Sequence, residues 1–217
     1  MNIKDNITSN ILNMLKDENI DHDKPLKILN VFYDTKIDTD TLKDNFKNLE
    51  IIDYKIENQN IDNLNLNTIN LNKSFDYIIL FETIEKLINY IMFLVNIKKY
   101  LKDDGNIVCI IPNIMYKDIL NNILKGKFTY CNDGIINKSN LRFFTLDEMI
   151  NLLDIGKYNV NKIMAIVTST TPQDEELINS LCNISNEGFR LNFNTHSYII
   201  SGSQKKDKTL YDYILSE

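Results

Sequence analysis

The stretch FDYIILF, residues 75–81, is an almost unbroken apolar run, and the run IVCII at residues 107–111 follows it. Such runs are typical of parallel strands that are covered on both faces. Between them, residues 82–101 carry apolar side chains three and four positions apart, as on one face of an amphipathic helix. This stripe consists of Ile84, Leu87, Ile88, Ile91, Leu94 and Val95. With a turn predicted at KDDGN, residues 102–106, the order is strand, helix, turn, strand, which indicates a parallel sheet.

The rest of the chain continues this alternation of strands and helices. The predicted helices cover residues 7–16, 39–48, 115–124 and 145–153, and another begins after Thr171-Pro172. The other predicted strands cover residues 27–33, 49–54, 158–167 and 194–201. Thr145 and Glu148 have the spacing of a capping box, which supports a helix start there. We therefore predict an α/β fold: a doubly wound, mostly parallel sheet with helices on both faces and a C-terminal antiparallel hairpin.

Length and composition favour one main domain. The chain has 217 residues, of which 43% are hydrophobic, and a formal net charge of -6. We predict an N-terminal helix or extension at 1–24, the domain at 25–203, and a polar tail at 204–217 with a final turn at 211–215. Residues 56–73 fit neither the helix period nor the strand period.

Charge, hydropathy and cysteine spacing exclude several classes of function. The acidic balance argues against a nucleic-acid partner. No uncharged apolar run approaches the ~18 residues of a membrane span, and no secretory signal is recognisable, so a cytoplasmic location is expected. The three cysteines form no Cys-x-x-Cys pair, and we expect neither a metal site nor a disulfide.

Two motifs follow the second apolar run. Pro112-Asn113 stops that run, and LRFFT stands at residues 141–145. Together with the strand–helix–turn–strand order, they resemble the C-terminal half of the S-adenosylmethionine-dependent methyltransferases with a Rossmann-like fold. The chain looks most like the subgroup often encoded beside glycosyltransferases, over residues 27–201. The resemblance implies S-adenosylmethionine as cofactor and a small-molecule or glycan-linked acceptor, as in cell-surface or flagellar glycan modification.

The first half of the chain departs from that family's pattern. The first strand of the family ends in a glycine-rich turn, because the backbone must pass close to the cofactor. Here residues 27–36 read KILNVFYDTK, so Phe32, Asp34 and Lys36 replace the glycines and Asn30 replaces an acid. By resemblance, Asn30, Phe32, Tyr33 and Asp34 would line the cofactor.

The residues that would hold the ribose and the adenine are also altered. The alignment puts Lys55 where the family has an acid that accepts both ribose hydroxyls, and a lysine cannot make that contact. A shift of two residues would place Asp53 or Glu57 there instead. Asp62 is the only candidate for the acid beside the adenine.

The loop after residue 81 keeps part of the family's motif. It reads FETIEKL at residues 81–87, which retains Glu85 but has Lys86 in place of a histidine. By resemblance, Phe81 and Glu82 would line the cofactor and Glu85 would be the catalytic base. The alternative is that both glutamates form the charged first turn of a helix.

The loop before the LRFFT motif supplies the substrate candidates. A second family histidine is replaced at Ser139-Asn140, and Asn140 and Arg142 are the residues that would contact the acceptor. The alternative for Arg142 is a structural role, in an ion pair or stacked on a ring.

Three functions remain open from the sequence. The first is a methyltransferase with a divergent cofactor site, acting on a small-molecule or glycan-linked acceptor. The second is a pseudo-methyltransferase that has lost cofactor binding and acts as a partner or scaffold subunit. The third is a domain that binds a different ligand, such as a nucleotide-sugar, in the same crevice. The conformation of the turn at residues 31–36 discriminates among them, since Phe32 or Tyr33 in the crevice would exclude the cofactor.

Overall fold

A single mixed sheet of six strands organises the chain. In this computed structural model, which describes residues 3–17, 25–34, 36–61 and 74–205, the strand order is β2-β1-β3-β4-β6-β5. The strands are β1 (Leu26–Phe32), β2 (Leu49–Lys55), β3 (Phe75–Phe81), β4 (Leu101–Pro112), β5 (Tyr158–Val167) and β6 (Thr195–Gln204). Strands β2, β1, β3 and β4 pair in parallel, and β6 pairs antiparallel with both β4 and β5. The predicted mostly parallel sheet and antiparallel C-terminal pair are confirmed.

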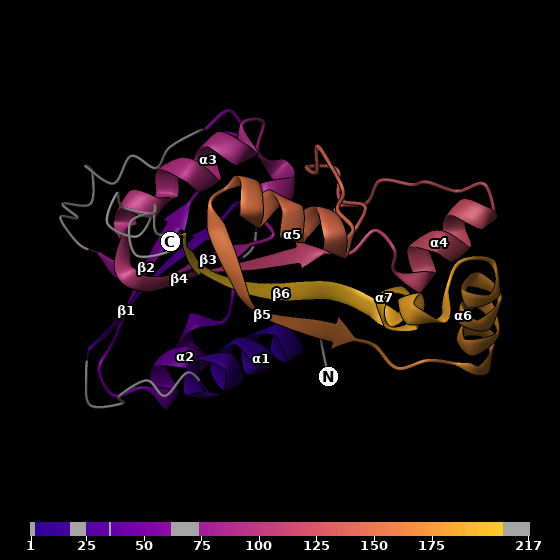
Figure 1. Cartoon of the computed structure of the whole chain (residues 1–217), viewed down its shortest axis with the longest axis horizontal. Helices are drawn as coiled ribbons and strands as arrows, with labels where there is room; N and C mark the ends of the chain where they lie inside the picture. The colour runs from indigo at the N-terminus through magenta and orange to yellow at the C-terminus, as the bar shows by residue number, and fades with distance from the viewer. Residues whose placement is uncertain (1–2, 18–24, 35, 62–73, 206–217) are drawn as a thin grey trace, which may run out of the picture.

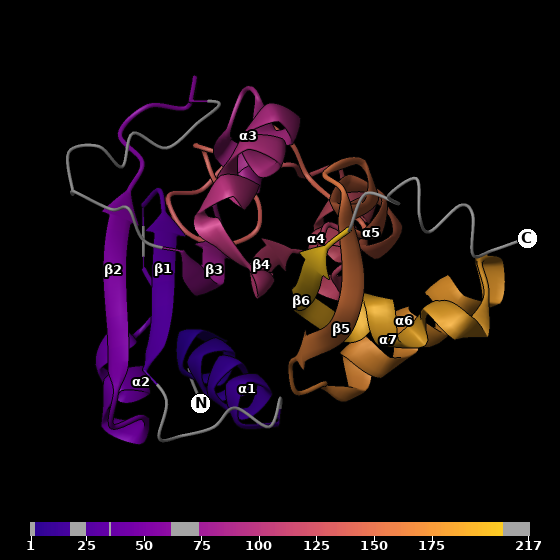
Figure 2. The ribbon, with the colours of Figure 1, turned by 60° about the vertical axis from the view of Figure 1, so that its left-hand side comes forward.

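Helices cover both faces of the sheet, as predicted (Figures 1 and 2). On one face lie α1 (Ile3–Asp17) and α2 (Thr39–Asn45), whose side chains Ile7, Ile11, Met14, Leu15 and Leu42 are buried. On the other face lie α3 (Tyr90–Ile97) and α5 (Leu146–Ile155). Burial of nearly continuous apolar strands between two helical layers is the main stabilising contribution of this architecture.

A smaller lobe extends from one end of the sheet (Figure 1). It contains α4 (Lys117–Leu124), α6 (Pro172–Ile184), the short 3-10 helix η4 (Glu187–Phe189) and α7 (Arg190–Asn194). Its own small core consists of Ile178, Cys182 and Phe193. Because α6 and α7 lie between β5 and β6, the antiparallel pair is closed by a helical excursion and not by a tight turn.

The long helix predicted at residues 82–101 is wrong in its bounds. A 3-10 turn, η2 (Ile84–Lys86), comes first, α3 covers only Tyr90–Ile97, and η3 (Lys98–Tyr100) leads directly into β4. The predicted turn at 102–106 lies inside β4, where a shift of register between Phe75 and Tyr77 of the neighbouring strand marks a bulge. A Cβ atom on Gly105 would lie 2.9 Å from the carbonyl oxygen of Phe75, so this bulge needs glycine.

The predicted apolar stripe is only partly buried. Ile84, Leu87 and Leu94 are buried, whereas Ile88, Ile91 and Val95 are exposed. Because the α-helix begins at Tyr90 and not at residue 82, the phase of the stripe changes, and Phe93 and Ile97 face the core instead.

Most other elements begin and end within about one helical turn of their predicted bounds. The capping box of Thr145 and Glu148 is present at the start of α5, and Thr171 with Asp174 forms a second one at the start of α6. Of the tail predicted at 204–217, residues 206–217 lie outside the described residues, and Gln204 belongs to β6. Of the irregular stretch 56–73, residues 62–73 also lie outside the described residues.

Candidate functional site

The site predicted from sequence lies at the carboxyl ends of β1 and β3. From β1 the chain continues through α2 to β2 on one side, and from β3 it continues through α3 to β4 on the other. The chain therefore diverges between these two strands, and open α/β sheets bind their ligands at such a point. The residues that follow the strands here are Tyr33 and Asp34 after β1, and Glu82 and Thr83 after β3.

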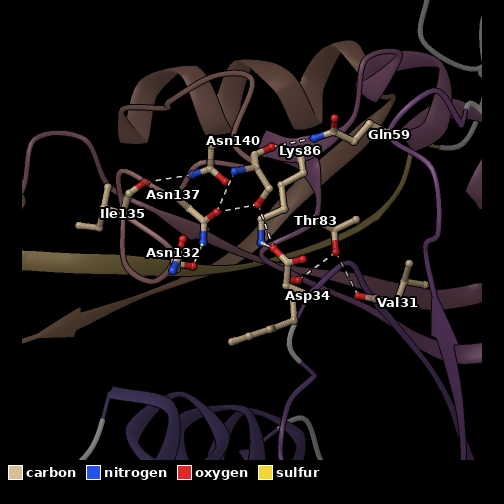
Figure 3. Close-up of polar contacts among 11 residues, drawn as sticks. Val31, Asp34, Gln59, Thr83, Lys86, Asn132, Ile135, Asn137 and Asn140 are labelled. Carbon is tan, nitrogen blue, oxygen red and sulfur yellow. Dashed lines mark hydrogen bonds and ion pairs between the residues drawn. The ribbon is translucent and has the colours of Figure 1, made fainter. Parts of the chain in front are cut away.

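An ion pair spans this divergence point (Figure 3). The ammonium of Lys86 lies 3.1 Å from a carboxylate oxygen of Asp34. The Lys86 side chain is only 2% exposed and that of Asp34 is 46% exposed. The Ser139 hydroxyl donates a hydrogen bond of 2.9 Å to the same oxygen of Asp34. Three segments that are remote in sequence thus meet on one carboxylate.

Side-chain amides hold the loop that carries Ser139 (Figure 3). Asn137 accepts from the backbone N–H of Ser139 at 2.8 Å and donates to the Asn132 carbonyl at 2.7 Å. Gln59 donates to the Ser139 carbonyl at 2.8 Å. Asn140, the predicted substrate residue, is buried and donates to the Ile135 carbonyl at 2.9 Å, so here it stabilises the loop.

The ends of β1 and β3 are also joined directly. The buried Thr83 hydroxyl lies 2.9 Å from the Phe81 carbonyl and 3.2 Å from the Val31 carbonyl. Glu82, just before it, has φ of 43°, in the left-handed region that a glutamate adopts only under constraint. Burial raises the pKa of the Glu82 carboxyl. The turn after β3 is therefore tightly determined by its surroundings.

Asp53, the acid predicted to bind the ribose, is contacted by two side chains of the protein itself. Asn30 is fully buried and donates from its amide to one oxygen of Asp53 at 2.8 Å. The Lys36 ammonium lies 2.7 Å from the other oxygen, and this contact raises the pKa of Lys36. Both acceptor atoms of Asp53 are therefore engaged. Asp62, the predicted adenine-side acid, lies outside the described residues.

Glu85, the predicted catalytic base, is buried beneath the divergence point. Its side chain is 2% exposed, and neither carboxylate oxygen has a hydrogen-bond partner among the described residues. Burial, and next the charge of Glu82, raises the pKa of Glu85 to about 8. The carboxyl is thus neutral at pH 7. Its backbone carbonyl accepts from the N–H groups of Leu141 and Arg142 at 2.8 and 3.3 Å.

Arg142 anchors the LRFFT loop to the segment after β3. Its guanidinium donates to the carbonyls of Leu87 and Ile84 and lies 4.0 Å from the centre of the Tyr90 ring. These contacts fit the structural alternative for Arg142, because they use its donors on backbone and its face on an aromatic ring.

The aromatic side chains predicted to line the cofactor have different surroundings. Phe81 is buried in the core beside α1 and α2, and Phe32 is half-buried. Tyr33 packs against the core on the α3 face, with the Lys86 ammonium 6.0 Å from its ring centre. The Tyr33 ring packs on the core and therefore does not fill the crevice, so by the criterion given above it does not exclude the cofactor. Any exclusion would come from the Asp34–Lys86 pair, which spans the divergence point.

A hollow of about 330 Å³ remains beside the divergence point, between α1 and the segment that follows β1. Its lining residues are Lys4, Asp5, Thr8, Lys36, Ile37, Asp38 and Phe81. Lys36, which pairs with Asp53, is one of these lining residues.

Sequence reasoning missed several members of this network. Lys86 was noted only as the replacement for a histidine, and Ser139 only as part of the Ser139-Asn140 pair that stands where the family has a second histidine. Gln59 and Asn137 gave no signal at all. One feature of the sequence could have indicated the ion pairs: charged residues stand at positions where the family pattern has glycine or histidine.

Comparison with known proteins gives a family and a fold. A family model described as "Methyltransferase domain" matches residues 4–154, more than half of the chain. Among solved structures, the chain is similar to an S-adenosylmethionine-dependent methyltransferase from Clostridium acetobutylicum, with 12% identity, a TM-score of 0.51 and coverage of 90% and 91% of the two chains. It is also similar to a SAM-dependent methyltransferase from Thermotoga maritima, with 12% identity, a TM-score of 0.50 and coverage of 94% of this chain and 91% of the other. A third similar structure is magnesium protoporphyrin IX methyltransferase from Synechocystis, solved with bound SAH, with 7% identity, a TM-score of 0.51 and coverage of 92% of this chain and 83% of the other. At these identities, the structural likenesses establish the fold alone.

Other searches gave negative results. A search of curated proteins found no significant match. None of the helices in the described part of the chain has the length and apolar character that a bilayer crossing requires. Within the same residues, no group of three or more His, Cys, Asp or Glu side chains is placed to hold a metal ion.

The residues present do not fit the cofactor that the resemblance implies. The turn after β1 has no glycine, whereas the family needs glycine there because its backbone passes close to the cofactor. Each oxygen of Asp53 already accepts one contact, from Asn30 or Lys36, and Asp34 is held by Lys86 and Ser139. A ligand in this position would compete with these two sets of charged contacts.

Proposed function

The chain belongs to the methyltransferase-domain family, and we propose that it is a non-catalytic member: a pseudo-methyltransferase that serves as a partner or scaffold subunit. The observation that carries this proposal is the Asp34–Lys86 ion pair, which spans the ends of β1 and β3. The engagement of both Asp53 oxygens by Asn30 and Lys36 supports it independently.

The energetic argument concerns Lys86. Its side chain is 2% exposed, so separating it from Asp34 would leave a buried charge without its partner. Removing one partner costs roughly 3 kcal/mol in a fully buried pair and at most about 1 kcal/mol in an exposed one, and this pair lies between because Asp34 is 46% exposed. A ligand that had to open the pair would lose about tenfold in affinity. Displacing Lys36 from Asp53 would also weaken ligand binding. This second loss would be smaller than the loss from opening the Asp34–Lys86 pair, because the Lys36–Asp53 contact is exposed.

Titration by calorimetry tests the proposal. The purified protein would be titrated with S-adenosylmethionine and S-adenosylhomocysteine, and its thermal stability measured with each ligand up to millimolar concentration. We expect neither heat nor stabilisation. Micromolar binding to the wild-type chain would overturn the proposal.

A variant with a reopened turn is the matched control. Phe32→Gly, Asp34→Gly and Lys36→Gly restore the glycines of the family pattern, and Lys86→His restores the histidine. We expect this variant to gain stabilisation by S-adenosylhomocysteine while the wild-type chain does not. That difference would show that the side chains of the turn, and not the fold, exclude the ligand.

A second function, methyl transfer to a small-molecule or glycan-linked acceptor, has one specific observation in its favour. Glu85 is a buried carboxyl without a partner among the described residues, and Glu82 beside it has a strained backbone. Perturbed carboxyls and strained residues cluster at functional sites. Release of S-adenosylhomocysteine from S-adenosylmethionine in the presence of sugar and amine acceptors would establish this function in place of the first.

A further inference from the structure

A hollow of about 260 Å³ lies between α4 and the loop that follows it. We call it the α4 hollow. Its lining includes three apolar side chains, Ile119, Ile135 and Ile136, and two charged ones, Lys127 and Asp133. The structure describes this part of the chain without a gap, and none of these residues belongs to the candidate site at the ends of β1 and β3.

One wall of the α4 hollow is an extended segment, residues 127–131. The odd-numbered residues 127, 129 and 131 line the hollow. Phe128 and Tyr130, which stand between them, contact each other and pack on Phe143, with 5.7 Å between the ring centres of Phe128 and Phe143. Such alternation is the side-chain period of an extended chain. The packing of the three rings therefore positions this wall from its outer side, without any ligand.

Backbone hydrogen bonds close the loop beyond this wall. The N–H of Cys131 donates to the carbonyl of Ile136 at 2.9 Å, and the N–H of Lys138 donates to the carbonyl of Cys131 at 2.9 Å. Gly134 lies between these contacts and has φ of 92°, a conformation that strains any residue with a side chain. The loop around the hollow thus has a defined conformation.

Two charges of opposite sign line the hollow without protein partners. Lys127 and Asp133 are both exposed, and neither side chain has an ion pair or a hydrogen bond among the described residues. The amide of Asn122 and the hydroxyl of Thr129, which also line the hollow, have no protein partner among these residues either. The polar groups of this hollow are therefore available to a ligand, unlike Asp34 and Asp53 in the crevice.

An apolar surface flanked by unlike charges matches a zwitterion with an apolar side chain. Its carboxylate would accept from Lys127, its ammonium would donate to Asp133, and its side chain would lie on the isoleucines. At about 30 Å³ for each water molecule, the hollow holds roughly eight or nine waters, which suits an α-amino acid of about leucine's size. We propose that the α4 hollow binds a small zwitterion of this kind, an α-amino acid with an apolar side chain.

The exposed thiol of Cys131 reports on the hollow directly. Cys131 lines it, whereas Cys109 and Cys182 are buried. Millimolar L-leucine should slow the alkylation of Cys131 by iodoacetamide several-fold in the wild-type chain, as measured by mass spectrometry of the peptide that contains it. Leucinol lacks the carboxylate and 4-methylpentanoate lacks the amine, so each should bind about fivefold more weakly than leucine. No protection by leucine, or equal protection by all three compounds, would overturn the proposal.

Substitution of each charge shows which end of the ligand it recognises. In calorimetry, Lys127→Met should weaken leucine binding about fivefold and leave leucinol binding unchanged, because leucinol has no carboxylate. Asp133→Asn should weaken leucine binding and leave 4-methylpentanoate binding unchanged. Lys125→Met, at an exposed lysine outside the lining, is the matched control and should bind leucine like the wild-type chain. Equal losses of leucine and leucinol in Lys127→Met would overturn recognition of the carboxylate.

This binding goes beyond the proposed function and does not depend on it. S-adenosylmethionine also carries an amino-acid end, so Lys127→Met separates the two sites. Heat from S-adenosylmethionine that persists in this variant comes from the crevice and bears on the proposed function. Loss of leucine binding in the same variant bears on the α4 hollow alone.

Discussion

Replacing Glu85 by glutamine should stabilise the protein, and the gain should grow with pH. The carboxyl has its pKa raised from 4.5 to about 8, mainly by burial. Below pH 4.5 the folded and unfolded chains both hold the proton. Above it the unfolded chain loses the proton while the folded chain keeps it, so the wild-type protein loses stability as pH rises toward 8. One pKa unit corresponds to 1.36 kcal/mol, which gives a cost of about 3 kcal/mol at pH 7. Glutamine keeps the size of the side chain and has no such titration.

Urea denaturation at several pH values measures this effect. The free energy of unfolding of Glu85→Gln minus that of the wild-type protein should be near zero at pH 4.5 and should rise to about 3 kcal/mol at pH 7. It should level off above pH 8. Glu176→Gln, an exposed glutamate on α6, controls for the chemical change alone. A difference that stays constant from pH 5 to pH 8 would refute the reasoning, because it would mean that the Glu85 carboxylate is charged and solvated in the folded protein.

Three further predictions concern single contacts. Asp34→Asn should lower the free energy of unfolding by about 1–2 kcal/mol, because the buried Lys86 charge loses its ion-pair partner while Asp34 itself is half exposed. Adding Lys86→Met should restore most of the loss, and additive losses in this double-mutant cycle would argue against the pair. Gly105→Ala should lower the free energy of unfolding, measured by chemical denaturation, by about 1–3 kcal/mol, because the new Cβ atom would lie 2.9 Å from the Phe75 carbonyl oxygen. An unchanged denaturation midpoint would mean that the bulge can shift. Thr145→Ala should remove the capping box of α5 and lower the free energy of unfolding by about 1 kcal/mol, which corresponds to about 2–4 °C in melting temperature. An unchanged melting temperature would mean that packing alone holds the start of the helix.

The strands of the sheet could be predicted from the sequence, whereas the bounds of the helix after β3 could not. Strands β3 and β4 are buried on both faces, so their continuous apolar runs identify them directly. The capping boxes are local patterns, and both helix starts that carry them are present in the structure. Helix α3 was misplaced because the three-and-four spacing of apolar residues runs through the 3-10 turn η2 and the break before Tyr90, which the spacing alone does not reveal.

The site was predictable as a set of positions but not as a network. Asn30 and Asp53 were both expected near the cofactor, yet their contact depends on the parallel register that pairs them across β1 and β2. The hydrogen bond from Ser139 to Asp34 joins residues 105 positions apart. Contacts of this kind follow from topology and loop conformation, which no local pattern in the sequence specifies.

The pairing among the altered positions argues for a crevice that is stable by itself. Lys86 stands where the family pattern has histidine, and it pairs with Asp34, which stands where that pattern has glycine. Asn30 and Lys36, at an acid and a glycine position, hold the two oxygens of Asp53. If each cofactor-site residue had been replaced without regard to the others, buried polar groups would be left without partners, at a cost of about 1–3 kcal/mol each. Here the replacements supply partners for Asp34, Asp53 and Lys86, whereas the side-chain oxygen of Asn30 and both oxygens of Glu85 are buried without a partner among the described residues. The charged contacts are the argument for the proposed non-catalytic role, and the unpartnered Glu85 carboxyl is the argument for the alternative, methyl transfer.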